Sequence, residues 1–436
     1  MQPTTAQIPD LDSLLQLATT ASRRTTMYIP SDILSQVFTH AAADSLPTLT
    51  AIRISHVCSH WRLVALSISR LWNHFDCSLG IPIAQLQMSR VSPNVPISVQ
   101  FSDLDDLHPE GHPARMTRWH IHRWLTEAQI ITFPRWNALN LTLSGETLRE
   151  SVVKVFDMLS DRNDELGFLV IRLVRAPDAG VVRATYRKLH FRPRHFHLNS
   201  WVFPGNWPGS PLHHASSFCY EGGRRTEVAP PLNFTLEQLS RAIFHHSCVL
   251  VICGRITAPS LTSLYLDNAL RAHFETIPLT PAKINRFSPG LQHLQIVDIH
   301  CNLLLWMVPQ SSLPNLLTLS LGRCHYRGGR PSGDEASLVQ TLVNMDVPST
   351  FPILQKLALQ NIPTPPHEFE SLLQSLPAST TLVILIGCPQ SNTISVDLMR
   401  ATHGINLSIQ LCGGEPGISR GAQLEFAGEW ESGLRP

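Results

Sequence analysis

The chain has 436 residues, and its hydrophobic share of 43% excludes a wholly disordered protein. Its 34 basic and 33 acidic side chains leave a net charge of +1, so the composition gives no general attraction to nucleic acid or to anionic membranes. No apolar run is long enough for a membrane-spanning helix. We therefore expect neither nucleic acid nor membrane as a partner.

The cysteines and the N-terminus indicate an intracellular protein. The nine cysteines include no C-x-x-C pair and their number is odd, which favours free, buried thiols in a reducing compartment over a disulfide framework. The first residues lack the apolar core of a signal peptide, because Asp10 and Asp12 interrupt it. We expect a cytoplasmic or nuclear protein in which residues 1–28 form a loosely ordered leader.

Residues 29–78 have the pattern of three short helices. Ser31 and Asp32 are good capping residues for the first helix, and Thr48 after Pro47 is one for the second. The apolar positions at helical spacing, with the closing Leu-Trp pair, are Ile33, Leu34, Val37, Phe38, Ala41, Leu49, Ile52, Val57, Cys58, Trp61, Val64, Ala65, Ile68, Leu71 and Trp72. A unit of this size has only a modest core, so some of its apolar faces should be left for a partner.

The order of these residues resembles the F-box, in the variant abundant in mushroom-forming fungi. The F-box pattern reads Leu-Pro-x-Glu-Ile-Leu, then Ile-Phe, then Val-Cys-x-x-Trp-Arg, then Leu-Trp. The matching residues are Ile29-Pro30, Asp32-Ile33-Leu34, Val37-Phe38, Val57-Cys58, Trp61-Arg62, Ala65-Leu66 and Leu71-Trp72. Ile29 replaces the usual leucine and Asp32 the usual glutamate, and both keep the chemistry of the position. The resemblance covers about a ninth of the chain.

This resemblance implies a partner and a set of contact residues. F-box domains dock on the Skp adaptor of cullin–RING ubiquitin ligases, while the rest of the chain recognises the substrate. The Skp-binding residues expected from the resemblance are Ile29, Pro30, Ile33, Leu34, Val37, Phe38, Val57, Cys58, Trp61, Leu71 and Trp72. The alternative interpretation of residues 29–78 is a helical hairpin that caps a larger fold.

A short apolar pattern recurs through residues 79–412. Each copy has an apolar residue, two variable positions, a second apolar residue, one variable position and a third apolar residue. The copies are Trp136-Leu139-Leu141, Phe168-Ile171-Leu173, Leu261-Leu264-Leu266, Leu291-Leu294-Ile296, Leu316-Leu319-Leu321 and Leu354-Leu357-Leu359. Helical patterns are found at 83–90, 236–244, 338–343 and 369–376, and a strand pattern at 97–101. Strands that alternate with helices at near-regular intervals indicate a solenoid.

The recurring pattern resembles a degenerate leucine-rich repeat array. Only Cys324 supplies the Asn or Cys that the repeat has at its ninth position, and the spacings are uneven. An irregular α/β or β-rich domain is the alternative, especially across 180–235, where the pattern disappears. The expected fold is therefore mixed α/β: a small all-α unit, then an irregular leucine-rich-repeat-like α/β solenoid, then a loose tail at 413–436.

Histidines supply the main signal for an enzyme. His190, His195, His197, His213 and His214 lie in a short span with Cys219 nearby. The alternation of His195 and His197 predicts a strand with both imidazoles on one face. A zinc site would need four nitrogen or sulfur ligands at recognisable spacings, and no second cysteine pair supports one. No nucleophile elbow, phosphate loop or zinc-protease signature appears. We expect no catalytic residue, cofactor or metal, and Cys58 is interpreted as a core residue.

These observations predict a non-enzymatic adaptor. Residues 29–78 would bind Skp and, through it, a cullin–RING ligase, while residues 79–412 would hold an unknown protein substrate. Ubiquitin transfer would then follow from proximity. Two alternatives stay open: a Skp-bound scaffold that acts outside the ligase, and a His-based metal-dependent hydrolase.

Overall fold

The computed structural model describes residues 29–42, 47–102, 121–144, 155–174, 187–200, 210–222, 234–245, 256–267, 288–297, 313–322, 338–362, 365–388 and 404–410. These residues belong to two compact units: the first has the described residues up to 100 together with 123–136, and the second has 101–102, 121–122 and the described residues of 137–410. No helix in the described part of the chain has the length and apolarity to cross a bilayer. The expected leader at 1–28, Cys324 and the expected tail at 413–436 lie outside the described residues.

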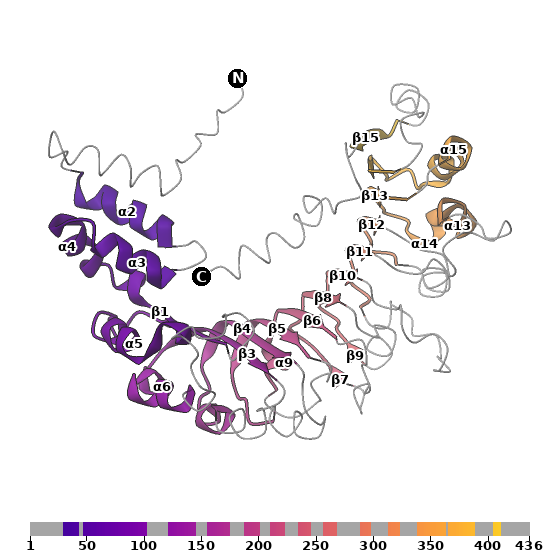
Figure 1. Ribbon diagram of the computed structural model, residues 1–436. Helices are drawn as coiled ribbons and strands as arrows, with labels where there is room; N and C mark the ends of the chain where they lie inside the picture. Colours follow the sequence, from indigo (N-terminus) through magenta and orange to yellow (C-terminus); the bar gives the residue numbers. More distant parts are fainter. Residues whose placement is uncertain are drawn as a thin grey trace. The chain divides into compact units, whose positions relative to one another are not determined.

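The first unit consists of short helices and one pair of strands (Figure 1). Its elements are α2 (Ser31–Ala42), α3 (Pro47–Ser55), α4 (Ser59–Ser67), a 3-10 turn (Ser69–Trp72), β1 (His74–Asp76), a second 3-10 turn (Cys77–Leu79), α5 (Gly80–Met88), β2 (Ile97–Ser102), α6 (Ile121–Glu127) and a third 3-10 turn (Ile130–Thr132). β1 and β2 pair in parallel. The three predicted helices and the strand at 97–101 are confirmed, and the helix predicted at 83–90 begins earlier, at Gly80.

Trp72 lies in the core of this unit. Its side chain is fully buried, and the indole N–H donates a hydrogen bond to the carbonyl oxygen of Ala65 at 2.9 Å. The guanidinium carbon of Arg90 lies 4.1 Å from the centre of the ring, within the range of a cation–π contact. Trp72 thus connects the end of α4 to the chain that follows α5.

Gln87 connects α5 to the elements before it. Its side-chain amide donates to the carbonyl oxygen of His74 at 2.6 Å and to the hydroxyl of Thr48 at 3.2 Å. The Thr48 hydroxyl itself donates to the same carbonyl at 2.6 Å, so Thr48 lies inside the first turn of α3 and is not the predicted cap. The compact unit therefore extends past residue 78, where the expected F-box domain ends.

The second unit is built on a parallel sheet whose strands follow one another in chain order (Figure 1). The strands are β3 (Trp136–Ser144), β4 (Glu165–Val174), β5 (Arg192–Asn199), β6 (Ser217–Glu221), β8 (Arg241–His245), β10 (Ser263–Asp267), β11 (His293–Val297), β12 (Thr318–Gly322), β13 (Lys356–Gln360), β14 (Leu382–Ile386) and β15 (Asn406–Gln410). A separate pair is formed by β7 (Phe234–Thr235) and β9 (Ile256–Thr257). Helices α9 (Pro211–His214), α13 (Leu338–Asn344), α14 (Val347–Thr350) and α15 (Pro366–Ser375) lie between strands in the chain, and α13 and α15 confirm two predicted helices.

The recurring leucines form buried rows across the strands. Leu264 pairs in register with Leu294, and the same row continues through Leu319, Leu357 and Val383. All five side chains are at most 1% exposed. Alternate residues of a strand point to opposite faces, so one face of this sheet is the apolar core. The expected parallel sheet is confirmed, whereas its description as a leucine-rich-repeat solenoid stays a prediction.

The predicted register of β4 is wrong by two residues. The prediction began the buried triplet at Phe168, but this side chain is only half-buried. Leu139 of β3 pairs with Leu169, so the buried triplet of β4 is Leu166, Leu169 and Ile171. Leu169, Ile171 and Leu173 are all apolar and lie on one face of β4, so a shift by two residues still gave an apolar pattern, and strand pairing selects one register.

Residues 236–244 contain a strand, not the predicted helix. β8 pairs with β6 on one side and β10 on the other, and Leu239, Ala242 and Phe244 take the three buried positions. The apolar spacing in this segment is compatible with either structure, because the run is short. Hydrogen bonding to strands on both sides stabilises the extended conformation of β8.

The sheet also continues through 180–235, where no repeat was predicted. β5 and β6 lie in this range and pair in register, with Phe196 opposite Phe218 and Leu198 opposite Tyr220. All four side chains are buried. The pattern was missed because aromatic residues take the inward positions that leucines take elsewhere.

Backbone carbonyls that each accept two hydrogen bonds fix where successive strands begin. The carbonyl of Ser216, for example, accepts from the N–H of Ser240 at 2.8 Å and from that of Arg241 at 3.1 Å. The same geometry repeats along the sheet at the carbonyls of Ser216, Ser240, Thr262, Gln292, Leu317 and Gln355. The donors are always the first residue of the next strand and the residue before it, so the register is set at the strand start.

Leu319→Ala tests this register. The substitution should lower the free energy of unfolding by roughly 2–5 kcal/mol, because it leaves a cavity in the leucine row. Ser320→Glu should cost much less, since Ser320 is half-buried on the opposite face of β12. Urea unfolding followed by circular dichroism measures both changes. Equal losses would show that the two side chains do not face opposite sides.

Candidate functional site

The helical unit exposes apolar side chains on two helices that pack together. Ile33 of α2 is 45% exposed, and Leu63 and Leu66 of α4 are 69% and 37% exposed. α2 and α4 contact each other through Phe38 and Trp61, whose ring centres lie 5.1 Å apart. Single exposed apolar residues are common, but several on adjoining helices form a surface that a partner can cover.

Four of the eleven residues expected to contact Skp are core residues instead. They are Leu34, Phe38, Leu71 and Trp72, each at most 2% exposed. Such side chains hold the helices together and have no surface to offer a partner. Pro30, Ile33 and Cys58 are exposed, and Ile29, Val37, Val57 and Trp61 are half-buried. A contact role for these seven stays a prediction.

Cys58 is an exposed helix cap and not a core residue. It precedes α4 in extended conformation, and its sulfur accepts a hydrogen bond from the backbone N–H of Trp61 at 3.4 Å. The sulfur thus occupies the place that a serine or aspartate oxygen usually takes at this position. The apolar pattern did not reveal this role, because cysteine was counted among the hydrophobic residues.

Leu63 and Leu66 are absent from the contact residues expected from the F-box resemblance. A signal for them was present in the spacing of α4. Val64 and Ala65 are buried, and residues 63 and 66 flank them at positions that fall on the outer face of a helix. Two exposed leucines three residues apart therefore indicate an apolar helix face that does not pack against the core.

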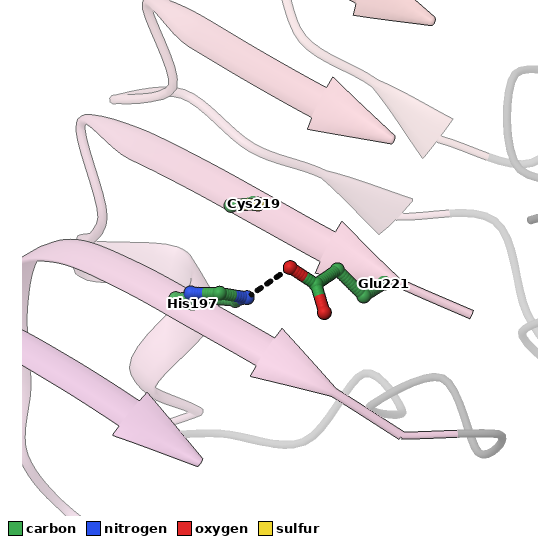
Figure 2. A group of neighbouring side chains, drawn as sticks. All are labelled: His197, Cys219 and Glu221. Atoms are coloured by element: carbon green, nitrogen blue, oxygen red, sulfur yellow. Dashed lines mark hydrogen bonds and ion pairs between the residues drawn. The ribbon is translucent and has the colours of Figure 1, made fainter. Parts of the chain in front are cut away.

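A second group of side chains lies on two neighbouring strands of the sheet, β5 and β6 (Figure 2). Its positions alternate with the buried aromatic positions of these strands, so the group is on the face opposite the leucine rows. His197 of β5 pairs in register with Cys219 of β6, and Glu221 lies two residues further along β6. The His197 Nε2 atom is 3.0 Å from one carboxylate oxygen of Glu221, and the Asn199 amide donates to the other oxygen at 2.5 Å. The ligand-type atoms of His197, Cys219 and Glu221 lie within 4.8 Å of one another.

Electrostatics keep Glu221 ionised and the neighbouring thiol neutral. Burial raises the pKa of Glu221, but the hydrogen bond and charge of His197, with His245 and Arg172, outweigh it and lower this pKa from 4.5 to about 2. Burial raises the pKa of the Cys219 thiol, Glu221 adds to that rise, and Arg172 opposes it. The cluster therefore joins a carboxylate and a protonated thiol.

Imidazole, thiolate and carboxylate are donors that divalent transition metals accept. Here Glu221 is already bound by His197 and Asn199, and the positive charge of Arg172 acts on the same carboxylate. A metal ion would have to displace these contacts and deprotonate Cys219. The arrangement is better suited to tie β5 to β6 by polar contacts.

The histidines that suggested a metal site do not gather around Cys219. Of the five, His197 is the one grouped with Cys219 and Glu221 among the described residues. His195 stacks on Phe168 with ring centres 4.7 Å apart. His190 and His214 line a polar surface cavity of about 270 Å³. His213 lies at the end of α9.

The pKa of Glu221 predicts an acid-labile contribution to stability. The folded-state pKa is below the ordinary value, so the stabilisation is complete above pH 4.5 and is lost as the pH falls toward about 2. Glu221→Gln should remove this part of the dependence, and the difference in unfolding temperature between variant and wild type should shrink on acidification. Parallel profiles from neutral pH to pH 2 would contradict the assignment.

Comparison with known proteins identifies one part of the chain. Residues 27–78 match the model of the F-box-like family, which confirms the expected F-box-like domain. No curated protein matches the sequence. The chain is similar to a solved chain from the crystal structure of the Rad7 and Elc1 complex in yeast, with 14% identity over 95% of this chain and 97% of that one. The TM-score of 0.37 is too low to establish a common fold.

Proposed function

We propose that this protein is a substrate-recognition adaptor of a Skp–cullin–F-box ubiquitin ligase. The F-box-like match at residues 27–78 is the observation that carries the proposal. F-box domains dock on the Skp adaptor, and Skp connects them to the cullin. The adaptor would act in the cytoplasm or the nucleus, and it would contribute no catalytic residue of its own, because the ligase supplies the chemistry by proximity.

The surface proposed to meet Skp is formed by Ile33, Leu63 and Leu66. Interfaces have an apolar centre where a few well-packed side chains supply most of the binding free energy. Val37 and Trp61 are half-buried beside this surface and could extend it. The buried residues of the F-box pattern would act indirectly, by holding α2 and α4 in place.

The parallel sheet of residues 137–410 is proposed to hold the substrate. Its strands repeat one buried triplet in register, which supports the interpretation as a degenerate leucine-rich-repeat array. Repeat arrays present the outward residues of successive strands as one extended surface. Polar and basic residues occupy outward positions on several strands here, so this face has the chemistry to bind a protein segment.

Skp binding is tested by placing a charge on the exposed helix surface. Ile33→Asp and Leu63→Asp should each weaken capture of the Skp adaptor by about tenfold or more, because a charge at the centre of an apolar interface loses its hydration. Leu86→Asp is the matched control, since Leu86 is also exposed, at 42%, but lies outside the F-box-like match. Pull-down with purified Skp measures the effect.

A further variant distinguishes residues of the proposed interface from residues of the core. Leu34→Asp should unfold the helical unit, because its side chain is 1% exposed, and circular dichroism would show that loss. Wild-type capture by both Ile33→Asp and Leu63→Asp would refute the proposed surface. Capture of Skp without a cullin in cells would favour the alternative of a scaffold that acts outside the ligase.

Metal content tests the hydrolase alternative. Purified protein should contain zinc well below one equivalent, since both carboxylate oxygens of Glu221 are already hydrogen-bonded, one to His197 and the other to Asn199. Inductively coupled plasma analysis after expression with added zinc measures this. One equivalent that disappears in Cys219→Ala would support a metal site and reopen the question of an enzyme.

A further inference from the structure

We infer that the sheet carries a binding row for an extended acidic peptide segment. The basic row consists of seven residues at equivalent positions of seven neighbouring strands, β5 to β13. They are His195, Ser217, Arg241, Ser263, His293, Thr318 and Lys356, paired in register from each strand to the next. Phe168 and Leu382 pair with its two ends and bound it with apolar side chains.

The basic row faces away from the core. Each member directly precedes a residue of the buried core row, such as Leu264 or Leu294. Its own side chain therefore projects from the opposite face of the sheet. Basic side chains alternate strictly with hydroxyls, and no carboxylate occupies any of the seven positions. His195, Arg241 and His293 are half-buried, as are Thr318 and Lys356, so their polar ends remain in reach of a ligand.

The positive charge of Arg241 reaches the histidines on both sides of it in the row. Burial lowers the pKa of His195, and the charges of Arg194 and Arg241 lower it further. Burial likewise lowers the pKa of His293, followed by the charges of Arg241 and Lys356. Arg241 therefore contributes on both sides, and an anionic ligand would relieve this repulsion.

The spacing of the basic groups fits an extended peptide. They recur on every second strand, and neighbouring strands are about 4.8 Å apart, so successive groups are separated by roughly 9–10 Å. A polyproline II segment rises about 3.1 Å per residue with three residues per turn, which brings every third side chain to one face at about 9.3 Å. An acidic residue at every third position would thus meet the basic row group by group.

Two features prepare the row for a ligand. Ser217 is 5% exposed, and its hydroxyl has no hydrogen-bond partner among the described residues, so it can donate to an anion. The doubly accepting carbonyls bind the backbone N–H of Arg241, Ser263, His293 and Lys356 at the strand starts. Side chains on a fixed backbone lose less conformational entropy on binding.

The carboxylate of Glu221 does not neutralise the basic row. Glu221 lies four residues beyond Ser217 along β6, a distance of about 13 Å along the strand. This exceeds the Debye length of about 8 Å at physiological ionic strength. Its carboxylate is also held by His197 and Asn199.

The inference names the substrate class of the proposed adaptor and in that respect rests on the proposed function. The test uses the full-length chain and a fluorescein-labelled peptide of four Glu-Pro-Pro repeats, with anisotropy as the readout. A second arm replaces Glu by phosphoserine, because carboxylate and phosphate offer the same anionic chemistry. Lys-Pro-Pro repeats and oligouridine serve as further probes. We expect the acidic peptides to bind, with affinity that falls as salt is added.

Arg241→Gln should weaken binding of the acidic peptide by about tenfold or more, because it removes a charge-assisted hydrogen-bond donor from the middle of the row. Arg241→Lys should retain part of the affinity, which separates loss of charge from misfolding. Arg123→Gln is the matched control: it changes the net charge equally, but Arg123 belongs to the helical unit and pairs with Glu127.

Each result decides the inference. Binding of either acidic peptide that depends on Arg241 supports it, and the tighter arm identifies carboxylate or phosphate as the source of the anion. Failure of both, equal loss in Arg123→Gln, or binding of oligouridine alone would overturn it. Skp capture by Arg241→Gln, measured in parallel, keeps the two proposals apart: intact capture without peptide binding would remove the inference and leave the adaptor function standing.

Discussion

The sheet depends on one repeated hydrogen-bond geometry at the strand starts. A single carbonyl accepts two N–H groups from the next strand, and this repeats from Ser216 to Gln355. The segments between paired strands differ widely in length, from 17 residues between β8 and β10 to 33 residues between β12 and β13. Because the register is fixed at the first residue of each strand, these differences do not shift the buried rows. Insertions can therefore accumulate between strands while the sheet stays in register.

A fixed register gives each position along a strand one environment throughout the sheet. The position of Leu264 is apolar and buried on strand after strand, while the preceding position, that of Ser263, is polar and faces outward. Charges far apart in the sequence thus become neighbours. Arg241 and His293 are separated by more than fifty residues, yet the charge of Arg241 lowers the pKa of His293, after the larger effect of burial.

The sequence was sufficient where leucine marked the buried positions, because leucine spacing distinguishes the two faces of a strand. It was insufficient at β5 and β6, where Phe196, Phe218 and Tyr220 take those positions, and at β8, where a short apolar run fits helix or strand. In the helical unit, sequence-based prediction failed for a different reason. An apolar pattern predicts which residues avoid water but does not separate core from interface, so Leu34 was expected at the surface and Leu63 was overlooked.

The buried amide of Gln87 has a consequence for modularity. The carbonyl of His74 accepts hydrogen bonds from both Thr48 and Gln87, so a donor within the family-matched segment and a donor beyond it satisfy the same buried acceptor. A chimera joined at residue 78 would supply only one of the two and would leave the Thr48 hydroxyl without the amide of Gln87. Recombination between relatives should therefore succeed only when residues 123–136, which complete the same compact unit, are exchanged together with the segment before them.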